Sequence, residues 1–196
     1  GSTHGSIVYG RLQWTQSGGN WTAAFLEDPW NKSESVPDAY YDLDNNLSFA
    51  VPQKSDPDGS ITPSKLAGSR LMMAVVRDGF LWTCHHVGLD GTDGDYDGGT
   101  VDRLGAGWFK MKIKTDNTLS LNRPTDGADY GRVYDTASSS PYHYYFPSLA
   151  VNSSGDMALG FSGSKGTEHI GAFFSGRRAS GSVPGKPVLI QAGRDY

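Results

Sequence analysis

The chain has 196 residues, a formal net charge of -4 at pH 7 and a single cysteine. A chain of this length fits one domain and can bury roughly 70% of the surface that its unfolded form exposes. One cysteine excludes an internal disulfide framework, and the weak negative charge excludes the broad basic surface that nucleic acid requires. No apolar run approaches the ~18 residues of a membrane-spanning helix, so we expect no nucleic-acid partner and no membrane span.

The composition favours strands and turns over helices. Glycine accounts for 26 residues, and aromatic side chains make up 12% of the chain. The acidic residues are nearly all Asp, with only Glu27, Glu34 and Glu168 as exceptions. Asp prefers turns and metal loops, whereas Glu prefers helices. We therefore predict an all-β protein in which residues 1–6 are a tag remnant or a disordered start and residues 7–196 form a single domain.

The N-terminal part begins with a predicted hairpin. Residues 7–14 and 21–25 are rich in β-forming side chains, and a Ser-Gly-Gly-Asn turn at residues 17–20 separates them. Residues 27–46 lose this periodicity and combine carboxylates, aromatic rings and proline, which is typical of a long loop. We expect a short strand over residues 47–51 before a further turn-rich stretch.

The clearest hairpin lies in the middle of the chain. Residues 71–76 and 80–87 are β-rich runs, and a tight connection that ends in Gly79 separates them. Both faces of both runs are mostly apolar. We therefore predict strands in the middle of a sheet that neighbouring layers cover on both sides.

The next strand-like segment, residues 108–114, has two different faces. Phe109, Met111 and Ile113 share one face, while three lysines alternate with them on the other. Lysines of this kind commonly protect an exposed sheet edge. We predict an outer strand here.

The last third has the pattern of a meander. Residues 144–151, 156–161 and 168–174 are predicted strands, and residues 152–155 and 162–166 are predicted turns. The second strand alternates bulky with small side chains, which suits close stacking of one sheet on another. Strand-turn-strand units of comparable size predict a β-propeller-like stack of four-stranded antiparallel blades, each of roughly 40 to 50 residues.

One run of sequence carries a resemblance. Tyr-Phe-Pro-Ser-Leu-Ala-Val-Asn-Ser-Ser-Gly-Asp-Met-Ala-Leu-Gly-Phe-Ser at residues 145–162, with the Phe-Leu-Trp segment at residues 80–82 and Gly176-Arg177 downstream, resembles a recurring segment of large secreted bacterial β-propeller proteins that are loosely sialidase-like. The resemblance covers about residues 70–180. It implies a complete minimal or a partial propeller and a secreted or cell-surface location. It implies no activity, because the turn at residues 152–155 departs from the Ser-x-Asp-x-Gly-x-x-Trp box of sialidases.

An acidic, glycine-rich segment predicts a metal site. Asp93, Asp95 and Asp97 stand at alternate positions and precede Gly98, as in the first half of a calcium-binding loop. An EF-hand would continue to a glutamate where this chain has Leu104, so this is a different kind of loop. We expect the three aspartates to bind calcium, and the alternative is a solvated acidic turn.

Cys84 and His86 form a second candidate metal site. Side chains alternate across a strand, so these two share a face and His85 points the other way. A transition metal would need further ligands, for which His143 and His169 are the candidates. We favour the alternative of a buried free thiol among packed imidazoles.

A loop rich in aromatic and acidic residues is the candidate ligand site. Aromatic rings stack on the apolar faces of sugars, and carboxylates accept hydrogen bonds from sugar hydroxyls. The candidate ligand-binding residues are Trp30, Asp38, Tyr40, Tyr41, Asp42 and Asp44. The same carboxylates, together with Glu27, could serve a glycosidase, which needs two of them on opposite sides of a bond, or the rings could simply pin the loop to the sheet.

These observations lead to one functional hypothesis and two rivals. We expect an extracellular, β-propeller-like domain that binds a glycan through its loops and holds one loop with calcium. The first rival is a glycoside hydrolase or lyase that uses loop carboxylates. The second is a structural domain that assembles with a second copy of itself or with a complementary chain.

Overall fold

The structure is a computed structural model of the chain. It describes residues 3–9, 12–25, 33–37, 51–54, 70–89, 101–116, 118–121, 129–181 and 184–194. Every regular element in these ranges is a β-strand, and all strand pairs are antiparallel. The all-β prediction is therefore confirmed, and within the same ranges there is no helix long and apolar enough to cross a bilayer.

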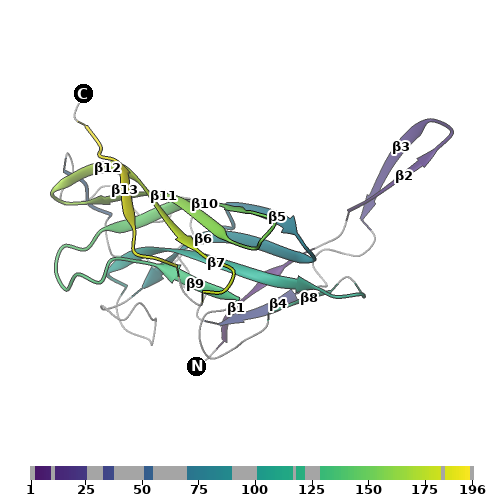
Figure 1. Cartoon of the computed structure of the whole chain (residues 1–196), viewed down its shortest axis with the longest axis horizontal. Helices are drawn as coiled ribbons and strands as arrows, with labels where there is room; N and C mark the ends of the chain where they lie inside the picture. The colour runs from purple at the N-terminus through teal and green to yellow at the C-terminus, as the bar shows by residue number, and fades with distance from the viewer. Residues whose placement is uncertain are drawn as a thin grey trace.

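Three layers of strands form the body of the molecule (Figure 1). The N-terminal layer is the pair β1 (Thr3–Val8) and β4 (Ser33–Pro37). The middle sheet contains β5 (Met73–Arg77), β6 (Phe80–Leu89), β7 (Arg103–Ile113), β8 (Leu119–Ser120) and β9 (Tyr130–Val133). The C-terminal sheet contains β10 (His143–Val151), β11 (Met157–Lys165), β12 (Glu168–Arg177) and β13 (Val188–Gln191) in that spatial order. A separate hairpin of β2 (Leu12–Ser17) and β3 (Asn20–Phe25) projects from this body (Figure 1).

The predicted central hairpin is present as β5 and β6. Its two-residue turn, Asp78-Gly79, has φ values of 49° and 77°, as the type I′ turns that match strand twist require. β6 is buried on both faces from Trp82 onward, as the apolar pattern predicts. The same prediction for β5 is wrong, because β5 is the first strand of its sheet and Val76 on it is 62% exposed. An apolar pattern alone does not distinguish an edge strand from a central one.

The prediction that residues 108–114 form an outer strand is also wrong. Residues 108–113 belong to β7, which pairs with β6 along one edge and with β8 and β9 along the other. The alternation itself is confirmed, because Phe109 and Met111 pack in a cluster with Ile7 of the N-terminal layer. Lys110 faces the opposite way and lies over the ring of Phe80 at 4.3 Å. Its long apolar stem allows a lysine to line an inner face while its charged end reaches the rim.

The main hydrophobic core lies between the middle and C-terminal sheets. The rings of Trp82 and Trp108 stack at 6.2 Å between centroids, and they pack against the inner face of the C-terminal sheet. Gly131 makes this packing possible, since a Cβ there would lie 2.9 Å from Nε1 of Trp108. The buried members of the core are Trp82, Cys84, Ala106, Trp108, Val133, Tyr144, Leu149, Met157, Leu159, Phe161 and Phe173.

The C-terminal sheet is the predicted meander with one strand more. β10, β11 and β12 follow each other as expected, and β13 adds an edge that the sequence analysis missed. The predicted turn at residues 162–166 is wrong, because β11 continues to Lys165 and the turn is Gly166-Thr167. Ser162, Gly163 and Ser164 have turn-like composition, but Ser162 and Gly163 pair with both neighbouring strands and Ser164 pairs with β10, which holds them in the sheet.

Candidate functional site

The two sites predicted with most detail lie outside the described residues. This applies to the candidate glycan residues Trp30, Asp38, Tyr40, Tyr41, Asp42 and Asp44, and to the candidate calcium ligands Asp93, Asp95 and Asp97. Both sites stay predictions. The ends of the strands that flank residues 90–100 are joined by a hydrogen bond of 3.0 Å from the Asp102 amide to the Leu89 carbonyl.

Cys84 is a packed core residue. It is fully buried, and its thiol donates a hydrogen bond of 3.3 Å to the carbonyl of Pro147. Burial raises the pKa of the thiol to about 12. His86 is also fully buried, with its ring edge-on to Phe146 at 6.1 Å. Across the part of the chain that the structure describes, no three His, Cys, Asp or Glu side chains lie close enough to hold a metal ion.

The strand that crosses over Cys84 contains a strained bulge. The register of β10 with β11 shifts between Tyr145 and Ser148, and Phe146 within this bulge has a φ of 52°. A bulky side chain rarely adopts this conformation. The bulge turns the Phe146 ring outward, where it is 45% exposed, and Cys84 secures the bulge through its hydrogen bond to Pro147.

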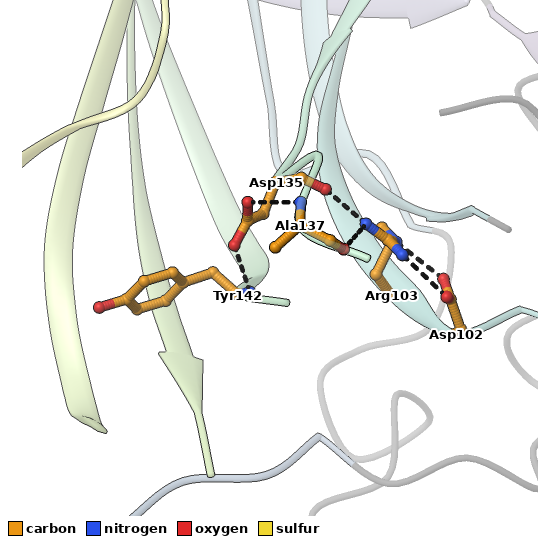
Figure 2. Close-up of polar contacts among 5 residues, drawn as sticks. All are labelled: Asp102, Arg103, Asp135, Ala137 and Tyr142. Carbon is orange, nitrogen blue, oxygen red and sulfur yellow. Dashed lines mark hydrogen bonds and ion pairs between the residues drawn. The ribbon is translucent and has the colours of Figure 1, made fainter. Parts of the chain in front are cut away.

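A buried arginine organises the connection between β9 and β10 (Figure 2). Arg103, at the start of β7, is 1% exposed and donates two hydrogen bonds of 2.8 Å to the carboxylate of Asp102. It also donates to the carbonyls of Asp135 and Ala137 at 2.6 and 3.0 Å. The Asp135 carboxylate accepts hydrogen bonds from the backbone amides of Ala137 and Tyr142. The four hydrogen bonds from Arg103 and the two to Asp135 fix both side chains within the fold, so we interpret the network as structural.

The β2–β3 hairpin displays two exposed tryptophans. Trp14 and Trp21 are 60% and 62% exposed. In the hairpin register Trp14 pairs with Ala23 and Trp21 pairs with Gln16, so both rings lie on one face as diagonal neighbours. The turn between the strands, Gly18-Gly19, has the positive φ values of a tight hairpin.

The two faces of this hairpin differ. We call the face with Leu12, Trp14, Gln16, Trp21 and Ala23 the tryptophan face. The opposite face carries polar side chains, among which Thr15 and Thr22 share a hydroxyl hydrogen bond of 2.8 Å. No residue from 12 to 25 is charged. The tryptophan face is therefore an uncharged, aromatic surface with one amide at its end.

The predicted hairpin of residues 7–14 and 21–25 is correct only in part, because the structure divides the first run between β1, which ends at Val8, and β2, which begins at Leu12. The pattern of residues did not single out the tryptophan face. A two-residue-turn register applied to the printed sequence places Trp14 and Trp21 on the same face. Whether that face is buried depends on what packs against it. The hairpin projects away from the layers (Figure 1), and this placement could not be read from the hairpin's own residues.

A broad hollow lies on the outer side of the C-terminal sheet. Its volume is about 980 Å³, which is within the range of ligand sites. Polar side chains line it, namely Gln53, Ser162, His169, Gln191 and Arg194. None of its described lining residues is a carboxylate. A glycosidase needs two carboxyl groups, so this hollow offers no support for the hydrolase hypothesis.

Comparison with known proteins leaves the chain's own residues as the only guide to function. No family model, curated protein or solved structure matches it. The resemblance of residues 145–162 to secreted propeller proteins stays a prediction. Any function must therefore be argued from the surfaces that the fold creates.

Proposed function

We propose that the protein is an extracellular carbohydrate-binding domain whose sugar-contacting surface is the tryptophan face of the β2–β3 hairpin. The observation that carries this proposal is the pair Trp14 and Trp21, each about three-fifths exposed on one side of a projecting element. Large aromatic rings bury most of their area when a packing partner is present. Two of them side by side in water indicate a surface that receives a partner.

The chemistry of this surface suits a sugar. The apolar face of a pyranose ring stacks on an indole ring, and an amide such as that of Gln16 can bond its hydroxyls. The absence of charge in residues 12–25 favours a neutral glycan for this face. The tryptophan face would contact a sugar chain from one side and leave its glycosidic bonds intact, so we propose binding without catalysis.

The predicted loops extend the same proposal. Trp30, Tyr40 and Tyr41 would supply further rings next to the carboxylates of the long loop. Calcium at Asp93, Asp95 and Asp97 would stabilise the connection between β6 and β7. Neither contribution is needed for the hairpin to bind.

The test is a glycan array followed by titration calorimetry with the best neutral oligosaccharide. We expect Trp14→Ala and Trp21→Ala each to weaken binding at least tenfold, which corresponds to ~1.4 kcal/mol. Gln13→Ala is the matched control, because Gln13 lies on the opposite face of the same strand. Unchanged affinity in the Trp14→Ala/Trp21→Ala double variant, or no glycan bound on the array, would contradict the proposal.

A second candidate function, assembly with another β-sheet, is favoured by a different observation. The middle sheet has a layer on each face, whereas the outer strands of the C-terminal sheet expose apolar side chains to solvent. These residues are Ile170, Phe174, Val188, Leu189 and Ile190, which are 41% to 64% exposed. We propose that the stack continues there with a further sheet, as in a β-propeller, where each blade packs between two others.

A further inference from the structure

A small pocket opens at one end of the space between the middle and C-terminal sheets. It lies where the β5–β6 turn approaches the β10–β11 turn, and its volume is about 270 Å³. This is close to the ~300 Å³ at which ligand sites begin, so it fits one ring and not an extended chain. We call it the turn-end pocket. It is distinct from the tryptophan face and shares no residue with it.

The inner wall of the turn-end pocket is aromatic and rigid. Phe80 and Trp82 form this wall. Trp82 is 2% exposed and stacks on Trp108 in the core, so its position is fixed by packing. Phe80 is half-buried and contributes the more accessible ring. The pocket therefore offers a pre-formed aromatic surface to a ligand with an apolar face.

Two cations line the same pocket. Nζ of Lys110 lies 4.3 Å from the centre of the Phe80 ring and 5.3 Å from that of Trp82. Its carboxylate partner is Asp129 at 4.0 Å, which is beyond hydrogen-bond distance, so the ammonium keeps N–H donors for a ligand. The guanidinium of Arg77, with a side chain 43% exposed, is the second cation. Its carboxylate partner, Asp78, also lines the pocket and lies 3.9 Å from Nε of Arg77, which is beyond hydrogen-bond distance.

The mouth of the pocket carries hydroxyl groups on a fixed turn. Ser153 and Ser154 line the pocket from the β10–β11 turn. The Asn152 side chain accepts hydrogen bonds of 2.9 Å from the amides of Ser154 and Asp156. Gly155 supplies the positive φ of 81° that the turn requires. The backbone that carries the two serines is therefore held in place before any ligand arrives.

We infer that the turn-end pocket binds a single carboxylate-bearing sugar ring, a uronic acid. Its carboxylate would accept hydrogen bonds from Lys110 and Arg77, since charge-assisted hydrogen bonds are the strongest available here. The apolar face of its ring would pack on Phe80, and its hydroxyls would bond the serines at the mouth. The inference rests on the proposed function only in taking a sugar as the body of the ligand, and it adds an acidic sugar at a separate site.

The experiment uses D-glucuronate as the ligand and D-glucose as its neutral match. Binding is measured by titration calorimetry and by the NMR shift of the Trp82 indole N–H in the full chain. We expect glucuronate to bind at least tenfold more tightly than glucose. Lys110→Met, which keeps the apolar stem and removes the charge, should weaken glucuronate binding at least tenfold, and Arg77→Gln should weaken it severalfold.

Lys112→Gln is the matched control, because Lys112 lies on the same face of β7 but is exposed and outside the pocket. The inference is overturned if glucose binds as tightly as glucuronate, if acetate binds as tightly as glucuronate, or if Arg77→Gln and Lys110→Met leave the affinity unchanged. Arg77→Gln keeps the test decisive even if Lys110→Met fails to fold, because Arg77 is a surface residue. Trp14→Ala/Trp21→Ala should leave glucuronate binding intact, so failure at the hairpin and failure at this pocket are distinguishable.

Discussion

At the scale of single residues, burial decides the chemistry of the core's polar groups. The thiol of Cys84 has a pKa raised to about 12 by burial, so almost none of it is the reactive thiolate at neutral pH. We expect iodoacetamide at pH 8 to leave Cys84 unmodified in the native protein and to modify it fully in denaturant, as mass spectrometry would detect. Rapid labelling of the native protein would contradict this picture of a packed thiol.

His143 gives the fold a dependence on pH. The pKa of His143 is lowered from 6.5 to about 4, chiefly by desolvation; Asp102 and Asp135 oppose this shift and Arg103 contributes to it. Between these two pH values, the imidazole of His143 is therefore protonated in the unfolded chain and neutral in the folded chain. The resulting stability is complete above pH 6.5 and is lost as the pH falls toward 4.

We expect the difference in unfolding free energy between pH 7 and pH 4.5, measured by urea titration, to be smaller by roughly 1–3 kcal/mol in His143→Gln than in the parent. His169→Gln is a suitable control, since that side chain lies at the outer hollow. An identical pH dependence in parent and His143→Gln would show that His143 is not responsible.

At the scale of elements, the Arg103 network is the clearest polar contact between the middle sheet and a connecting segment. One guanidinium makes four hydrogen bonds, of which two join the start of β7 to the connection between β9 and β10 and two bind the carboxylate of the neighbouring Asp102. Lysine cannot reproduce this geometry, because it presents a point charge where arginine presents a planar fork. We expect Arg103→Lys to lower the unfolding free energy by about 1–3 kcal/mol in thermal or urea melts. The exposed Arg178→Lys should change it little, and equal effects would contradict the assigned role.

The elements also indicate what sequence patterns can and cannot predict. The positions of β6, β10 and β12 follow from apolar runs between glycine-containing turns, and the bulky and small faces of β11 follow from alternation. The predicted places of β5 and β7 in their sheet are wrong, because alternation specifies which face of a strand is apolar and not which strands pair along its edges. The sequence pattern missed β13 because Val188–Gln191 is too short to give a period.

The candidate sites were harder to predict for the same reason. Motif reasoning favoured the loops around Tyr40 and Asp95, where chemistry-bearing residues are close in sequence. The turn-end pocket brings together Arg77, Lys110 and Ser153, which lie far apart along the chain. Pairing of β5 and β7 with β6 brings Arg77 and Lys110 together within the middle sheet, and stacking of the C-terminal sheet adds Ser153. No spacing in one sequence encodes either step.

At the scale of the whole molecule, the exposed C-terminal sheet predicts self-association. Apolar side chains on β12 and β13 form a patch of the kind that marks an interaction surface. We expect light scattering at low micromolar concentration to detect a species larger than the monomer. Ile190→Lys should shift the association equilibrium toward the monomer, because a charge in the apolar patch opposes its burial against a second sheet.

Val76→Lys is the control for this prediction. Val76 is as exposed as Ile190, at 62% against 64%, but lies on the edge of the middle sheet. It should leave the association unchanged. A stable monomer at every concentration, in the parent as in both variants, would remove self-association as a function of this surface.

The hydrogen bond from the Leu119 amide to the hydroxyl of Tyr9 has a consequence for synthesis. It joins residues 110 positions apart, and Ile7 beside it packs on β7 and Leu119 in the same cluster. A ribosome adds ~5–20 residues per second, so the first strand waits on the order of 5–20 s for its docking surface. The C-terminal sheet has no such delay, because the middle sheet on which it packs is synthesised before it. The strand β1 is therefore synthesised well before its docking surface, and we expect it to need protection during translation.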